Sequence, residues 1–160
     1  MSIGEEVTGV FTHMLHALDL RQWQAVRDAF ADHVDVDVDY SSLFGVPAAT
    51  VSSDEQIGAW RSFVGAFDAT QNLTGPLVAS EREGAVLGTT SVRGYHRIIG
   101  TPGGDTWMVA GIYHVRFVHR RAGWRIVGLT LKVLYQDGNL GLPGIAKGRA
   151  TAPTPIPPTP

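Results

Sequence analysis

A few polar residues fall at positions where the sequence pattern directs side chains toward the protein interior. His96 lies in the stretch 85–99, where the alternate residues on its own face are small or apolar. A histidine whose pKa lies near neutrality can take a proton from a substrate, and a carboxylate such as Asp19 can fix its tautomer. General-base catalysis of this kind accelerates a reaction by roughly 10²–10⁴. Tyr40 and Tyr113 could donate hydrogen bonds to a substrate carbonyl and stabilise a developing enolate.

Each of these residues also has an ordinary structural interpretation. Asp19 could cap the short helix expected after it, and His96 could be a core histidine whose hydrogen bonds are satisfied. Asn72 can hydrogen-bond a substrate but cannot carry a proton near neutral pH. The catalytic interpretation requires contact between Asp19 and His96 beside an open cavity, whereas a filled interior would favour the structural one.

Other classes of function leave no signature in the chain. It has no G-x-S-x-G turn, phosphate loop, dinucleotide fingerprint or HExxH motif, and it has no cysteine. His13 and His16 lack a third ligand, so we expect no metal and no cofactor. The net charge of −2 and the absence of a basic run predict no nucleic-acid partner.

No segment has the pattern of a secretion signal or a membrane span, so we expect a cytoplasmic protein without a membrane partner. The length of 160 residues predicts one domain, which we place at residues 1–141. Residues 142–160 are rich in Pro, Gly and Thr, and we expect an extended or disordered tail there.

The elements that must position the polar residues differ in period along the chain. Apolar residues at three- and four-residue steps predict a helix over 7–18, a short helix from Trp23, and a third helix after a capping box at Ser52. Strict alternation over 34–40 predicts a strand between the second and third helices. From about residue 70, apolar residues recur at every second position, which predicts long antiparallel strands over 72–81, 85–99, 106–119 and 124–136. This order is typical of an α+β fold with helices on one face of a bent sheet.

The order and spacing of four short segments resemble scytalone dehydratase and, more broadly, the SnoaL-like branch of the nuclear transport factor 2-like superfamily. The segments are Asp19–Trp23, Val38–Ser42, Thr70–Asn72 and Gly123–Ile126. The resemblance covers about residues 5–140. It implies a cone-shaped, strongly curved mixed β-sheet packed against three N-terminal helices around an apolar pocket.

The resemblance also implies site residues by position. It implies catalytic positions at Asp19, His96 and Tyr40. The substrate-binding residues expected beside them are Asn72, Tyr113, Trp60 and Leu18. The chain departs from the family pattern where Asn72 replaces a second histidine and where Leu18 replaces a tyrosine. A mechanism with His96 as general base, oriented by Asp19, is therefore expected, whereas a two-histidine dehydration does not transfer intact.

We therefore expect a cofactor-independent acid/base enzyme of the lyase or isomerase type (dehydratase, isomerase or cyclase) acting on a small, apolar, carbonyl-containing substrate, polyketide-like or aromatic. One alternative is a non-catalytic ligand-binding or structural subunit, which the loss of the second histidine favours. Another is an epoxide hydrolase, which would need a second inward carboxylate or an arginine beside Asp19. The resemblance further implies a homodimer or homotrimer formed through the exposed sheet face, where we expect Arg93, Tyr95 and Arg97.

Overall fold

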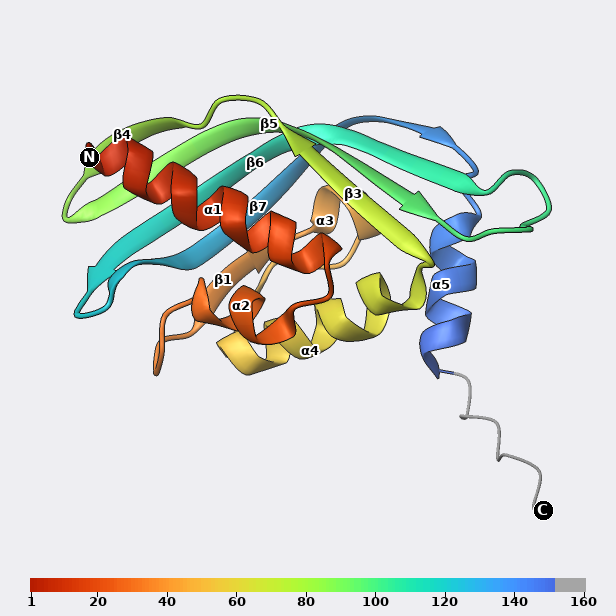
Figure 1. The fold of residues 1–160 in the computed structure, drawn as a ribbon, viewed down its shortest axis with the longest axis horizontal. Helices are drawn as coiled ribbons and strands as arrows, with labels where there is room; N and C mark the ends of the chain where they lie inside the picture. The colour runs from red at the N-terminus through yellow and green to blue at the C-terminus, as the bar shows by residue number, and fades with distance from the viewer. Residues whose placement is uncertain (152–160) are drawn as a thin grey trace, which may run out of the picture.

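In the computed structural model, residues 1–151 are described, and they form a curved mixed sheet with helices on its concave side (Figure 1). The strands of this part of the chain are β1 (Val36–Asp39), β2 (Ala49–Val51), β3 (Ala69–Thr74), β4 (Val78–Arg82), β5 (Ala85–Arg97), β6 (Thr106–Arg120) and β7 (Gly123–Gly138). They are arranged in the order β2-β1-β7-β6-β5-β3, and β4 also pairs with β5. Strands β1 and β7 run parallel, and the other strand pairs described are antiparallel. The expected α+β class and mixed, curved sheet are thus confirmed.

The helices begin where the sequence provides hydrogen-bond acceptors for their free N–H groups. Ser2 and Ser52 each form a capping box with the glutamate three residues later, which satisfies donors at the starts of α1 and α4. The helical segments are α1 (Ile3–Asp19), α2 (Trp23–Asp28), α3 (Ser41–Phe44), α4 (Ser53–Phe63), the 3₁₀ turn η1 (Val64–Ala66) and α5 (Leu142–Thr151). None of those helices is both long enough and apolar enough to cross a membrane.

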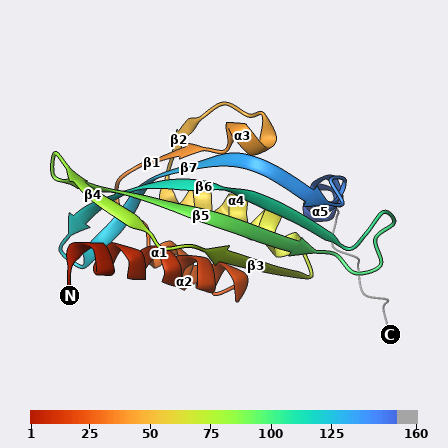
Figure 2. The same cartoon turned by 90° about the horizontal axis from the view of Figure 1, so that it is seen from above.

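Helix α1 covers the edge of the sheet that carries β3 and β4, while β1, β2 and α3 lie at the opposite edge (Figure 2). Its apolar stripe includes Val7, Phe11 and Met14, each at most 1% exposed. Burying each such side chain stabilises the fold by roughly 1.5–3 kcal/mol. This packing fixes the C-terminal end of α1, and therefore Asp19, beside β3.

Strand β5, which pairs with β6, shows the alternation that the sequence predicts. In β5, Val86, Val92 and Gly94 are buried, while Arg93 and Arg97 on the other face are exposed. The pairing of β6 with β7 shifts register beside Gly111, and such irregularities bend a strand. A Cβ atom on Gly111 would lie 2.6 Å from the Lys132 carbonyl oxygen, so glycine permits the close approach there.

The expectation of an extended or disordered segment from residue 142 is wrong for residues 142–151, which form α5. Leu142 and Ala146, one helical turn apart, are both fully buried. Pro143 lies in the first turn, where its missing N–H leaves no helical hydrogen bond unmade. Packing therefore outweighs the low helix propensity of Gly144 and Gly148. The remainder of the predicted tail, 152–160, lies outside the described residues.

Candidate active site

The concave face of the sheet, the helices α3, α4 and α5, and the C-terminal end of α1 surround a cavity of about 590 Å³. Its lining is mainly aliphatic and aromatic, which agrees with the expected apolar pocket. Six of the seven predicted site residues line it, and these are Leu18, Tyr40, Trp60, Asn72, His96 and Tyr113. The seventh, Asp19, does not. Within residues 1–151, no three His, Cys, Asp or Glu side chains group closely enough to hold a metal ion.

Asp19 lies behind the cavity wall, where its carboxylate accepts hydrogen bonds from β3. The Asn72 backbone N–H donates to Oδ2 at 2.8 Å, Asn72 Nδ2 donates to Oδ1 at 2.8 Å, and Thr70 Oγ1 donates to Oδ1 at 3.0 Å. The residue before α2 is Gln22, and no side chain caps that helix, so the capping interpretation of Asp19 is wrong. No hydrogen bond joins Asp19 to His96 in the described chain, so the expected direct pair does not form either.

The register of β3 against β5 explains why the direct pair does not form. Thr70 lies opposite His96, and Asn72 lies opposite Gly94. A Cβ atom on Gly94 would lie 3.0 Å from Asn72 Oδ1 and 3.2 Å from His96 Cε1, so the two side chains share the space above this glycine. Because Asn72 Nδ2 is bound to Asp19, its Oδ1 is the atom directed toward Gly94. Asn72 therefore supplies a hydrogen-bond acceptor to the cavity.

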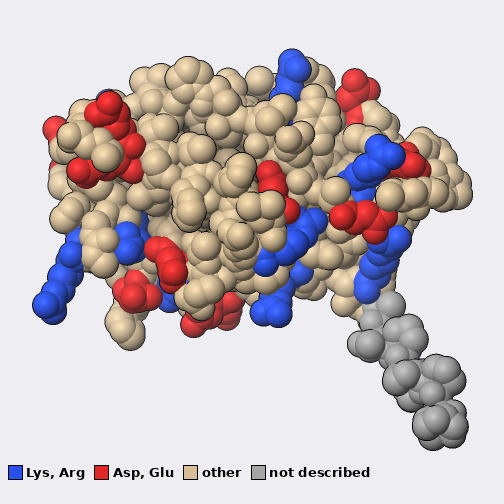
Figure 3. Space-filling model, viewed as in Figure 1, with Lys and Arg blue, Asp and Glu red and all other residues tan. Residues whose placement is uncertain are grey.

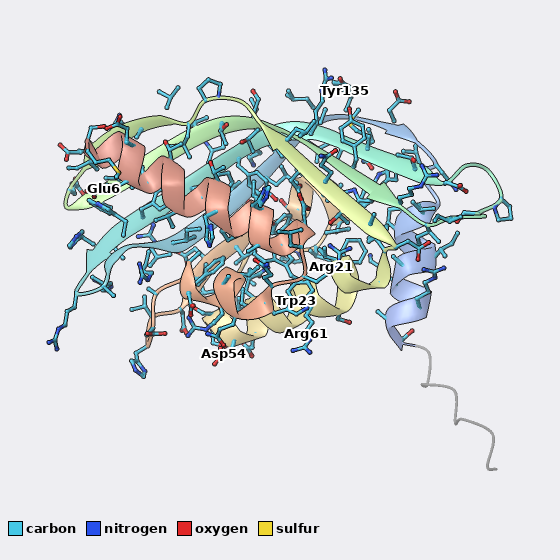
Figure 4. All side chains as sticks on the ribbon, viewed as in Figure 1. Glu6, Arg21, Trp23, Asp54, Arg61 and Tyr135 are labelled. Atoms are coloured by element: carbon cyan, nitrogen blue, oxygen red, sulfur yellow. The ribbon has the colours of Figure 1, made fainter. Side chains whose placement is uncertain are left out.

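Arg21, which was not among the predicted site residues, lies just after the end of α1 and hydrogen-bonds the residues that hold Asp19 (Figure 4). Its Nη1 donates to Thr70 Oγ1 at 2.7 Å and to the Leu18 carbonyl at 3.1 Å. Arg21 adopts a φ of 59°, a left-handed conformation that is costly for a side chain with a Cβ. Burial lowers the pKa of Arg21 and the charge of Asp19 opposes that shift, while the guanidinium stays protonated.

One ring nitrogen of His96 is hydrogen-bonded to the backbone, and the other is available to accept a proton. Its Nδ1 lies 3.3 Å from the Trp107 carbonyl oxygen, which can only accept, so Nδ1 carries the hydrogen. No described side chain hydrogen-bonds to Nε2, which presents its lone pair because Nδ1 carries the hydrogen. Burial lowers the pKa of His96 to about 4, against the opposing effects of the Trp107 hydrogen bond and the Asp19 charge. The ring is therefore neutral near pH 7 and can accept a proton.

The two predicted tyrosines meet across the cavity wall. Tyr40 Oη and Tyr113 Oη are 3.2 Å apart. Burial is the main cause that raises the pKa of both phenols, and that of Tyr40 is raised well above its ordinary value. Both hydroxyls therefore keep their protons near neutral pH. The hydrogen of one hydroxyl lies in the hydrogen bond between the two tyrosines, so the hydrogen of the other hydroxyl is available for a substrate oxygen.

Several cavity residues were not predicted because they come from α5 and from the segment before α4. Lys147 and Thr151 line the cavity from α5, and Phe44 lines it from α3. The spacing of Leu142 and Ala146 is the sequence signal for the α5 contribution, but two glycines and a proline obscure it. For α3, we identify no comparable signal.

The chain belongs to the SnoaL-like domain family, whose model matches residues 2–130. It is similar in structure to the Kfla4162 protein from Kribbella flavida, with 24% identity, a TM-score of 0.78, and coverage of 92% of this chain and 96% of that one. A candidate scytalone dehydratase from Novosphingobium aromaticivorans has 14% identity and a TM-score of 0.67, with 84% of this chain and 86% of that one covered. The hexachlorocyclohexane dehydrochlorinase LinA-type3 from Novosphingobium barchaimii has 14% identity and a TM-score of 0.65, with 86% of this chain and 90% of that one covered. No curated protein matches the sequence.

Identities this low establish the fold and not the activity. The family match and the structural neighbours confirm the resemblance to SnoaL-like and scytalone dehydratase-like proteins that the four short segments indicate. Enzymes named for elimination reactions occur among these neighbours. The reaction and the substrate of this chain depend on its own site.

Proposed function

We propose that this protein is a cofactor-independent acid/base enzyme of the lyase or isomerase type that acts on a small, apolar, carbonyl-containing substrate, polyketide-like or aromatic. One observation carries the proposal: a neutral imidazole with a free Nε2 lines the same apolar cavity as the paired hydroxyls of Tyr40 and Tyr113. A base and a hydrogen-bond donor facing one apolar space are the groups that enolisation requires.

In the proposed step, His96 Nε2 takes a proton from the carbon next to the carbonyl group. The electron pair of that C–H bond forms a C=C bond, and the carbonyl π electrons move to the oxygen. A hydroxyl of the Tyr40–Tyr113 pair donates to that oxygen as its negative charge develops. The apolar lining strengthens this hydrogen bond by excluding competing water.

The low pKa of His96 constrains the second proton transfer. A group with a pKa of about 4 cannot serve as the initial acid near pH 7, but the imidazolium formed by abstraction gives its proton up readily. Returning that proton to another carbon gives an isomerisation. Delivering it to a departing hydroxyl gives elimination of water, with the enolate pair forming the new double bond. Cyclisation instead needs the enolate carbon to attack a second carbonyl of the same substrate.

Asp19 and Asn72 have different roles in this proposal from those the sequence indicated. The Trp107 carbonyl, rather than Asp19, orients His96. Asp19 is a positioning residue, since it holds Asn72 with Oδ1 toward the cavity, where this oxygen can accept a hydrogen bond from a substrate hydroxyl. The acceptor at Asn72 and the donor at Tyr113 would together orient a hydroxyketone.

Two other functions are compatible with the sequence. Non-catalytic ligand binding remains a second candidate, because an asparagine stands where the family pattern has a second histidine and the cavity alone suffices for binding. An epoxide hydrolase is less well supported. Arg21 does lie beside Asp19, but neither residue lines the cavity in which a water would have to attack.

Incorporation of deuterium from solvent tests the proposal. A panel of aromatic and aliphatic ketones, with and without a β-hydroxyl group, would be incubated in D₂O and followed by mass spectrometry. We expect the parent to exchange at least one ketone and His96→Gln to lose about 100-fold or more of that rate. His114→Gln, on the exposed outer face of β6, is the matched control. Equal exchange by the parent and His96→Gln would overturn the assignment of the base, and binding without any exchange would favour the ligand-binding alternative.

A further inference from the structure

Lys147 is the one charged side chain among the cavity-lining residues, which all lie within the described part of the chain. We propose that it forms an oxyanion subsite at the cavity mouth, so that the preferred substrates carry a carboxylate or phenolate at the end remote from the reacting carbonyl. The proposal deepens the proposed function and rests on it for the assignment of the other end to His96.

Lys147 is held in place by a docked helix. Its neighbour Ala146 is fully buried, and so is Leu142 one turn earlier. Arg149 Nη1 donates to the Ala66 carbonyl at 3.2 Å and pairs with Asp68 at 3.0 Å. Figure 1 shows α5 at the end of the sheet where β3 follows α4. The backbone of Lys147 is thus fixed at the rim of the cavity.

A row of cavity-lining aromatic rings separates Lys147 from His96. The ring centroids of His96 and Trp107 are 4.4 Å apart, and those of Trp107 and Phe63 are 6.5 Å apart. The row continues to Phe44, whose ring centroid is 5.4 Å from that of Phe63 and 4.8 Å from Lys147 Nζ. An aromatic ligand body packed along this wall would have the base at one end and the ammonium group at the other.

Within residues 1–151, no carboxylate neutralises the charge of Lys147. No Asp or Glu side chain of residues 1–151 lies within ion-pairing distance of its Nζ, whereas Arg149 on the same helix is paired. The ammonium group instead lies over the ring of Phe44, a contact that leaves its hydrogens free for an anion. His96 and both tyrosines are neutral near pH 7, so the lining carries a net positive charge.

This positive charge is local. The chain as a whole carries −2, and acidic and basic side chains are interspersed on the face shown in Figure 3. A general attraction of the protein for anions would therefore not account for anion binding in the cavity.

Two probes that share a ring system and differ in charge test the subsite: 2-naphthoate, an anion, and 2-naphthamide, its neutral analogue. Calorimetric titration of the full chain at pH 7.4 should give about 10-fold tighter binding of 2-naphthoate, because it alone can pair with Lys147. Lys147→Gln should remove this preference and leave the affinity for 2-naphthamide within about twofold of the parent value. Lys132→Gln, an exposed lysine outside the cavity, is the matched control and should behave as the parent does.

Three results would overturn the subsite: a parent that binds both probes equally or not at all, a Lys147→Gln variant that keeps the preference, or equal losses for both probes. The last result would show that Lys147 acts only through packing. The assay does not depend on turnover. If the naphthoate preference holds while deuterium exchange fails, the anion subsite stands and the catalytic proposal falls.

Discussion

The carboxylate of Asp19 accepts two hydrogen bonds from Asn72, one from the backbone N–H and one from Nδ2, each at 2.8 Å. These contacts join the end of α1 to β3 and determine which atom of the Asn72 amide faces the cavity. They also place the carboxylate behind the wall of the cavity instead of inside it. Asp19 therefore contributes to the site by holding Asn72.

Replacement of Asp19 by Asn should destabilise the fold, because a neutral amide cannot accept all the hydrogen bonds that the carboxylate receives from Asn72 and Thr70. We expect the free energy of unfolding to fall by about 2 kcal/mol, the range for hydrogen bonds to a charged group. Urea denaturation at pH 7 measures this. Asp28→Asn is the control, since Asp28 has one exposed partner, Gln24. A D19N variant as stable as the parent would contradict the bracing role.

The neutral, largely buried His96 should make stability depend on pH. In the unfolded chain its pKa returns to 6.5, whereas in the folded protein it is about 4. Between these values the unfolded state binds the extra proton, so the free energy of unfolding should fall with decreasing pH by up to about 1.4 kcal/mol per unit. Above about pH 7.5 this contribution should be constant, because His96 is then mostly neutral in both states.

Urea denaturation from pH 7.5 to pH 4.5 tests this dependence on the parent and on His96→Gln. The variant lacks the titrating group, so its free energy of unfolding should depend less steeply on pH. Between pH 6.5 and pH 4.5 the difference in slope should correspond to the uptake of about one proton on unfolding. Parallel curves for the two proteins would show that the folded-state pKa of His96 is not lowered.

Removing a hydroxyl from the tyrosine pair should affect turnover more than binding. In Tyr113→Phe the cavity keeps its ring packing but loses one of its paired hydroxyls. We expect the rate of deuterium exchange at saturating ketone to fall by roughly 10²–10³, as for other removed oxyanion donors. Tyr135→Phe removes a hydroxyl that bonds Arg93 on the outer face of the sheet and should leave the rate unchanged. A Y113F variant with the parent rate would exclude the pair from catalysis.

Gly94 provides the space in which Asn72 and His96 approach each other. The added methyl of Gly94→Ala would lie 3.0 Å from Asn72 Oδ1 and 3.2 Å from His96 Cε1, so at least one side chain must move. We expect a loss of about 10-fold or more in exchange rate, since small displacements of reacting groups are costly. Gly58→Ala, where no atom lies within 4 Å of the new methyl, should keep the rate and raise stability by about 0.5–1 kcal/mol. Parent-like exchange by G94A would show that the arrangement tolerates displacement.

The outer face of the sheet carries apolar side chains without a partner in the described chain. Leu134 is 65% exposed, Leu73 51% and Tyr135 48%, and the three line one shallow groove (Figure 4 labels Tyr135). Exposed apolar surface of this kind is typical of an interface, and a homodimer or homotrimer through this face remains our prediction. Light scattering after gel filtration should show an oligomer for the parent and a monomer for Leu134→Glu. A parent that is monomeric at micromolar concentration would exclude this assembly.

The strands that carry the site were predictable because their pattern is local. In β5 the alternation of Val92, Gly94 and His96 with exposed arginines identifies the inward face without reference to any other strand. Alternation likewise placed Tyr113 on the inward face of its strand, and helical spacing placed Trp60 on the apolar side of its helix. Short capping signals at Ser52 likewise marked the start of α4.

The relation of Asp19 to His96 was not predictable, because it depends on how α1 docks and on the register of β3 against β5. A shift of two residues in that register would have placed Asn72, instead of Thr70, opposite His96. Helix α5 was missed for a different reason. Its stability comes from burial of Leu142 and Ala146 against the rest of the protein, whereas local propensity opposes a helix there.

The central claim is that His96 presents a free Nε2 to the cavity as a neutral imidazole. Nitrogen-15 NMR of the histidine rings at pH 7, with His96 assigned by comparison with His96→Gln, measures this directly. We predict a neutral ring protonated on Nδ1, with a pKa of about 4 on titration. A charged ring at pH 7, or a neutral ring protonated on Nε2, would contradict it.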